Sequence, residues 1–171
     1  TSSWRISSAR FSENNPMSGV EARLTGLGLT LPDVAKPVAA YLPAVRAGDL
    51  VWTSGQLPTV AGELASKGKV GSEVGAEHAV ELARVCALNA LAAIKAELGD
   101  LDLVERVVKV VVFVASDPSF SGQSAVANGA SELLASAFGD AGRHARSAVG
   151  VAVLPLNAPV EVEVVVQVKS S

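Results

Sequence analysis

The chain has 171 residues, of which 49% are hydrophobic and 18% are charged, with a net charge of −3 and a pI of about 5.4. This length fits one domain, and the acidic balance excludes a nucleic-acid surface, which needs clustered Lys and Arg. No run approaches the ~20 apolar residues of a membrane helix, so we expect no membrane partner. The apolar excess over an ordinary small soluble protein predicts burial between subunits, since obligate interfaces resemble a core cut in half.

Cysteine and histidine are too scarce for a typical structural metal site. Cys86 is the single cysteine, so we expect no intramolecular disulfide and no cysteine-based zinc site. The two histidines are His78 and His144. We therefore predict no metal site, and a reducing, cytoplasmic setting.

The N-terminal segment differs in character from the rest of the chain. TSSWRISSARFSENNP is polar and Ser-rich and lacks the continuous apolar core of a secretion signal. Met17 is the single methionine, and MSGVEARL resembles a natural start. We interpret residues 1–16 as a leader or added extension, 17–35 as an N-terminal extension, and 36–169 as the single domain.

The first half of the chain predicts a short helix and a hairpin. Val20–Leu24 can form a helix that is closed by glycines, and the following LTLPDVAKPVAAYLP carries three prolines and should be irregular or extended. AVRAGDLVWTSG predicts a strand, a Gly48–Asp49 turn and a second strand over Leu50–Ser54. The next stretch, PTVAGELASKGKVGSE, has the composition of a loop.

A long helix is predicted from about Gly75 to Leu98, with Gly99 as its stop. Its apolar residues recur at spacings of three and four, which is typical of one buried helix face. They are Val80, Ala83, Ala87, Leu91, Ile94 and Leu98.

The second half of the chain predicts three strands and another helix. The β-branched run Val104–Val114 is the strongest strand signal, and its near-continuous apolar character predicts burial on both faces. A helix is expected over Ser124–Phe138, ended by Gly139. Strands over Arg146–Val153 and Val160–Val168 then close the chain, with LPLNAP between them.

The resulting order is β-β-α-β-α-β-β. It predicts a two-layer α+β domain in which two helices cover one face of a single mixed sheet. The other face would stay bare in a monomer, and its apolar composition again predicts an oligomer.

The familiar catalytic motifs are absent from the sequence. It contains no phosphate-cradling Gly-rich loop with Lys-Ser/Thr, no GxGxxG and no GxSxG. VWTSGQLP places a serine beside a glycine, but no histidine has the context of a triad partner, so we do not expect a nucleophilic serine. The candidates that remain lie in or beside strands, and they are Tyr41, Ser54, Arg146 and Glu161.

Each charged candidate has two interpretations. Arg146 opens a strand of small and apolar residues, and it either reaches solvent at a sheet edge or points into a cleft. Glu161 and Glu163 share a face, because strand residues two apart do, and they form either the solvated face of an edge strand or part of a site. His78 is predicted at the surface, and Cys86 as a small core residue.

Two motifs carry a resemblance to a known family. YLPAVRAGDLVWTSGQLP and ARSAVGVAVLPLNAPVEVEV, with the β-α-β-α pattern between them, resemble the Rid/YjgF family of reactive-intermediate deaminases from about Lys36 to Val168. The resemblance implies a chorismate-mutase-like fold and a homotrimer. In that assembly the sheets face inward, the helices face outward, and clefts lie between neighbouring subunits.

The resemblance also implies roles for the four candidates. Arg146 of the ARS motif would bind a substrate carboxylate, and Glu161 would be associated with the attacking water. Tyr41 and Ser54 would line the same cleft. The implied activity is that of a 2-iminobutanoate/2-iminopropanoate deaminase, which hydrolyses 2-enamine or 2-imino acids to 2-keto acids and ammonia without a cofactor.

The sequence departs from the family pattern in places, and three functions stay open. Ala148 occupies a position where many members carry cysteine, and the Thr59–Ser72 and Gln123–Ser131 segments resemble a longer branch of the family. The chain is a deaminase, a non-catalytic trimer that binds small carboxylates, or a cleft recruited for condensation or cyclisation. Some members are linked to RNA cleavage, but the acidic balance and the lack of a basic stripe argue against that here.

Overall fold

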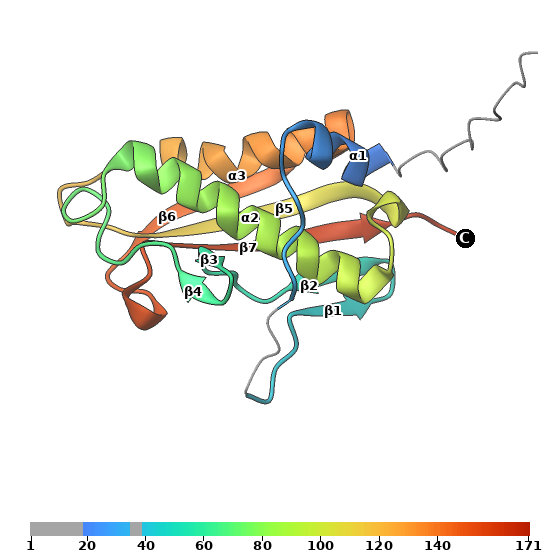
Figure 1. Ribbon diagram of the computed structural model, residues 1–171, viewed down its shortest axis with the longest axis horizontal. Coiled ribbons are helices and arrows are strands. Elements are labelled where there is room, and N and C mark those ends of the chain that lie inside the picture. Colours follow the sequence, from blue (N-terminus) through green and yellow to red (C-terminus); the bar gives the residue numbers. More distant parts are fainter. Residues whose placement is uncertain (1–18, 35–38) are drawn as a thin grey trace, which may run out of the picture.

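Helices form one layer and a sheet forms the other in the computed structural model (Figure 1), which describes residues 19–34 and 39–171. The predicted leader, residues 1–16, lies outside the described residues. The predicted β-β-α-β-α-β-β order is confirmed. It is accompanied by the predicted short helix near the start, α1, by a two-stranded hairpin, β3–β4, and by short 3-10 helices.

The main sheet has five strands in the order β1-β2-β7-β5-β6. Their bounds are Ala44–Ala47, Leu50–Thr53, Val160–Val168, Val104–Ala115 and Ala145–Val151 in that order. The pair β5–β6 is parallel and the other neighbours are antiparallel, so the sheet is mixed as predicted. The last strand of the chain, β7, therefore lies at the centre, and β6 lies at an edge.

Two long helices, α2 (Ala76–Leu98) and α3 (Gln123–Phe138), cover one face of this sheet (Figure 1). Both end at the predicted glycines. Gly99 and Gly139 have φ values of 86° and 62°, in the left-handed region that glycine tolerates best. Within residues 19–34 and 39–171, no helix combines the length and the apolar character needed to cross a membrane.

Alternation along the strands directs one set of valines under the helices. In β5, Val110, Val112 and Val114 are fully buried there, whereas Val111 and Phe113 on the opposite face are only half-buried. The prediction that this strand is buried on both faces is therefore wrong for a single chain. The helices supply cover on one side only, and the second face keeps exposed apolar groups such as Trp52.

The stretch predicted as a loop contains a hairpin of two short strands, β3 (Thr59–Val60) and β4 (Glu63–Leu64). Its turn residues, Ala61 and Gly62, have φ values of 51° and 83°. Positive φ at both positions is required by the type I′ hairpin turn, for which Asn-Gly or Asp-Gly is the usual signal. The Ala-Gly pair lacks that signal, so a hairpin could not be predicted at this position.

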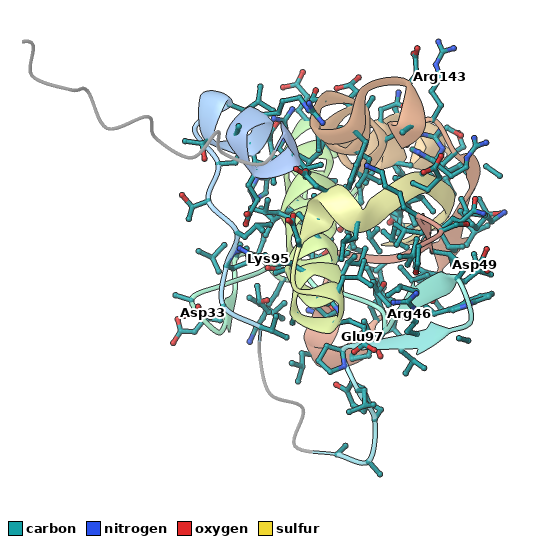
Figure 2. The ribbon with its side chains drawn as sticks, turned by 90° about the vertical axis from the view of Figure 1, so that its right-hand side faces the viewer. Asp33, Arg46, Asp49, Lys95, Glu97 and Arg143 are labelled. Carbon is teal, nitrogen blue, oxygen red and sulfur yellow. The ribbon has the colours of Figure 1, made fainter. Side chains whose placement is uncertain are left out.

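The first helix, α1 (Gly19–Gly26), contains the predicted Val20–Leu24 helix and is fastened by a distant residue. The Asp102 carboxylate accepts hydrogen bonds from the backbone N–H of Gly19 and Val20, at 2.8 and 3.0 Å. A carboxylate satisfies unpaired N–H groups and complements the helix dipole at this end. Lys95 of α2, labelled in Figure 2, forms an ion pair with Glu21 of α1.

We predict that Gly129→Ala destabilises the protein by about 1–3 kcal/mol, the usual cost of overpacking. Gly129 lies where α3 crosses α2, and a Cβ there would come within 1.9 Å of the Val80 carbonyl oxygen. Urea unfolding at fixed protein concentration measures the effect. Gly75→Ala is the matched control, since its Cβ would meet no atom within 4 Å. A Gly129→Ala free energy of unfolding equal to that of the control would contradict the packing described.

Candidate functional site

Arg146 stands at the edge of the sheet and is held by α3. In β6 it pairs with Val110, which is buried under the helices, so the Arg146 side chain leaves the sheet on the helix side. Its Nη1 donates to Asn128 Oδ1 at 2.8 Å and to Ser131 Oγ at 3.2 Å, and its Nη2 donates to the Ser124 carbonyl at 3.4 Å. The guanidinium is thus fixed along one side by three residues of α3.

A pocket of about 480 Å³ opens beside this arginine. It lies between the second half of α3 and the start of β6, and Arg143 at its rim projects outward from the molecule (Figure 2). His144 bridges the two elements inside it. His144 Nε2 lies 2.9 Å from Ser131 Oγ, and Nδ1 lies 2.6 Å from the Gly142 carbonyl oxygen.

Glu161 lies on the opposite face of the sheet. Its neighbours in β7, Val160 and Val162, are fully buried under the helices, so alternation directs Glu161 to the other side. The carboxylate occupies the space beside the Gly55 backbone, where an added Cβ would come within 1.8 Å of Glu161 Oε1. Burial raises the pKa of the Glu161 carboxyl, and the nearby Glu163 carboxylate raises this pKa further.

Ser54 and Tyr41 belong to the part of the chain beside Glu161 rather than to the part beside Arg146. Ser54 precedes Gly55, and its hydroxyl donates to the Leu42 carbonyl oxygen at 2.5 Å, while its backbone N–H donates to the Pro43 carbonyl oxygen at 2.8 Å. These bonds hold the segment that follows Tyr41 against the end of β2. The Tyr41 side chain is 58% exposed.

The four predicted site residues therefore fall into two groups within one chain. Glu161 lies against Gly55, the residue after Ser54, and Tyr41 precedes the segment that is hydrogen-bonded to Ser54, whereas Arg146 lies on the helix side of the edge strand. The four do not form one site within a single chain. The alternative interpretation of Glu161 and Glu163 as the face of an edge strand is wrong, because β7 is the central strand and both residues are half-buried.

The remaining predictions concern residues outside the site. His78 is exposed and Cys86 is fully buried, as predicted. Burial raises the pKa of the Cys86 thiol well above its usual value, which suits an unreactive core residue. Across residues 19–34 and 39–171, no cluster of three His, Cys, Asp or Glu side chains could hold a metal ion.

Sequence reasoning missed three polar residues that surround Arg146. Asn128 and Ser131 lie three residues apart on α3, so they share a face of this helix. His144 lies two residues before the arginine, which directs it to the same face of an extended segment. Those spacings are visible in the sequence, but they acquire meaning only once α3 is known to pack beside β6.

The chain is similar to proteins of one family. Residues 21–168 match the family described as "YjgF/chorismate mutase-like, putative endoribonuclease". Protein TCP17 of Trypanosoma cruzi is 47% identical over 152 residues, which cover 88% of this chain and 95% of that protein. The crystal structure of Atu1372 from Agrobacterium tumefaciens, titled as of unknown function, superposes with a TM-score of 0.83 at 47% identity, covering 88% and 92% of the two chains. The YjgF gene product of E. coli superposes with a TM-score of 0.59 at 26% identity, covering 81% and 94%.

We predict that Glu161→Gln stabilises the protein at pH 7–8 and that this gain disappears below pH ~4, where carboxyl groups are protonated. The pKa of Glu161 is raised in the folded state, so in the pH window between its usual value of 4.5 and the raised value the folded state binds more protons than the unfolded state. The free energy of unfolding of the wild type therefore falls as the pH rises through the window. Thermal unfolding across this pH range, at fixed protein concentration, checks it. An exposed control, Glu132→Gln, should show no such pattern, and a pH-independent difference for Glu161→Gln would contradict the prediction.

Proposed function

Because the chain belongs to the YjgF/chorismate mutase-like family and has its α+β fold, we propose that it hydrolyses reactive 2-enamine and 2-imino acids to 2-keto acids and ammonia. The observation that carries the proposal is that only part of the Arg146 guanidinium is hydrogen-bonded to the described residues. Three of its five donors face α3, and among the described residues its Nε–H has no partner. Nε–H and the second Nη2–H lie side by side and match the two oxygens of a carboxylate.

The proposed site is completed by a second subunit. Arg146 and Glu161 of one chain leave the sheet on opposite faces, so an arginine can meet a glutamate only across an interface. Proteins of this family are generally small trimers, and the half-bare second face with its exposed Trp52 suits such an assembly. We place Arg146 of one subunit opposite Glu161, Ser54 and Tyr41 of its neighbour.

The chemistry follows from these groups. An enamine first tautomerises to the imine, whose carbon is already electrophilic, so no redox step is required. Arg146 holds the carboxylate and thereby fixes the adjacent carbon. Glu161 accepts one proton from water as the oxygen bonds to that carbon and passes it to the nitrogen, which gives a carbinolamine. Glu161 then accepts the hydroxyl proton of the carbinolamine and delivers it to the amine as the C–N bond breaks. Water and imine give ketone and ammonia, and Glu161 ends in its initial state.

The environment of Glu161 suits a group that alternates between base and acid. Its raised pKa lies closer to neutrality than that of an ordinary carboxyl, which favours proton transfer in both directions. The Ser54 proton is engaged by the Leu42 carbonyl. Its oxygen lone pairs therefore remain to accept a hydrogen bond from the imine nitrogen or from the water.

Two other functions use the same cleft. A non-catalytic carboxylate binder needs Arg146 but has no use for Glu161. A cleft for condensation or cyclisation needs both. A half-buried carboxylate with a perturbed pKa is more typical of a catalytic site than of a binding site, which favours an enzyme. RNA cleavage is not proposed, because a net charge of −3 does not suit a polyanion.

We predict that the purified protein competes with semicarbazide for 2-iminopropionate generated from alanine by an amino-acid oxidase. Arg146→Ala should lower kcat/KM roughly 10–100-fold through the lost charged hydrogen bonds. Glu161→Gln should lower kcat by about 10²–10⁴-fold as a lost general base. The rate of semicarbazone formation measures both. An inactive wild type that is correctly assembled would reject the deaminase and leave the binding or condensation functions.

We also predict that co-refolded Arg146→Ala and Glu161→Gln subunits recover activity. In a cyclic trimer with intersubunit sites, every mixed trimer contains one site with both intact residues. Random assembly at equal amounts should therefore restore about a quarter of the wild-type activity. Each variant refolded alone is the control. No recovery despite mixed trimers, verified by native mass spectrometry, would mean that both residues act within one subunit.

A further inference from the structure

We infer that Ser131 and His144 act as a positioning pair that aims Arg146 at its carboxylate. The inference rests on the proposed function, because Arg146 is the carboxylate-binding group there. Neither residue belongs to the motifs that carry the family resemblance. Both lie in the pocket beside Arg146, and a continuous series of hydrogen bonds links them to its guanidinium.

The direction of each hydrogen bond follows from the groups involved. The Gly142 carbonyl oxygen can only accept, so the contact at 2.6 Å selects the tautomer with a proton on His144 Nδ1. In a neutral ring Nε2 is then an acceptor, and the Ser131 hydroxyl must donate to it across 2.9 Å. With its proton so placed, Ser131 Oγ presents lone pairs to Arg146 Nη1 at 3.2 Å.

This arrangement makes His144 an indirect determinant of the arginine geometry. Without an acceptor at His144 Nε2, the Ser131 hydroxyl can rotate its proton toward Arg146, where it opposes a cation. Asn128 Oδ1 holds the same Nη1 at 2.8 Å, so losing Ser131 should loosen the guanidinium without releasing it. An arginine that must be ordered at each binding event costs affinity, whereas a fixed one does not.

A purely structural role is a poor explanation for these contacts. The buried side of α3 is formed by other residues, including Val126, Leu133 and Leu134. Ser131 and His144 are half-buried at the pocket, outside the main hydrophobic core. Removing their hydrogen bonds should therefore change how Arg146 binds its ligand more than how the chain folds.

Two measurements on the assembled protein test the positioning pair. They are the Kd of pyruvate, a 2-keto acid product of the proposed reaction, by titration calorimetry, and the apparent KM and kcat for 2-iminopropionate. Ser131→Ala and His144→Leu should each raise Kd and KM roughly 3–10-fold, the range for one lost hydrogen bond, with kcat within about twofold of the wild type. The double variant should lose no more than either single variant, since the two act in series.

Conservative variants separate positioning from packing. His144→Gln places an amide oxygen near the position of Nε2, so it should restore the wild-type Kd and KM. Ser136→Ala, on an exposed position of the same helix, is the matched control and should change neither constant. Unchanged constants in Ser131→Ala and His144→Leu, or a failure of His144→Gln to rescue, would overturn the inference.

These measurements distinguish failure of the positioning pair from failure of the proposed function. If the wild type binds pyruvate but hydrolyses no imine, the proposed function fails, and the pyruvate Kd of the variants still decides the positioning pair. If the wild type hydrolyses the imine and the variants match it, the positioning pair fails alone. A wild type that neither binds pyruvate nor hydrolyses the imine overturns both.

Discussion

The two faces of strand β7 have opposite chemistry, and the rest of the molecule depends on keeping them apart. Val160, Val162, Val164 and Val166 are buried under α2 and α3, while Glu161 and Glu163 point the other way. A shift of one residue in the register would bury both carboxylates under the helices, at a cost of several kcal/mol for each unpaired charge. The packing of these valines in the hydrophobic core therefore determines the face of the sheet on which Glu161 lies.

The same core determines where Arg146 lies, although by a different route. The parallel register of β5 and β6 places Arg146 level with Val110, on the helix side. A short side chain there would pack on α3, as Ala148 packs against the core two residues later. The long side chain of arginine passes beyond that packing and meets the polar residues of α3. This separation of an arginine and a carboxylate within one chain supports the proposal that adjoining subunits each contribute half of the site.

Most helices and strands could be predicted from local sequence patterns, but the pairing of the strands could not. Some signals depend only on residues close in the sequence. They are the spacing of apolar residues in α2, the β-branched run of β5 and the glycines that end the helices, and the elements predicted from them are confirmed. The central place of β7 and the parallel β5–β6 pair depend on partners more than 30 residues away, which no local pattern encodes. Arg146 and Glu161 could thus be chosen as candidates from sequence, but their separation onto opposite faces could not.

The surroundings of Glu161 indicate that this carboxylate serves chemistry rather than stability. Its burial and the neighbouring Glu163 charge both disfavour the ionised form, so a glutamine or a valine would be less costly at this position. Gly55 leaves the space that the carboxylate fills, and any larger residue would displace the carboxylate before it disturbed the backbone. A charged group that costs stability, with a glycine that makes room for it, is typical of a site under functional constraint. An interface that buries Glu161 more deeply would raise its pKa again, so assembly would tune the proposed catalytic carboxyl as well as complete the proposed site.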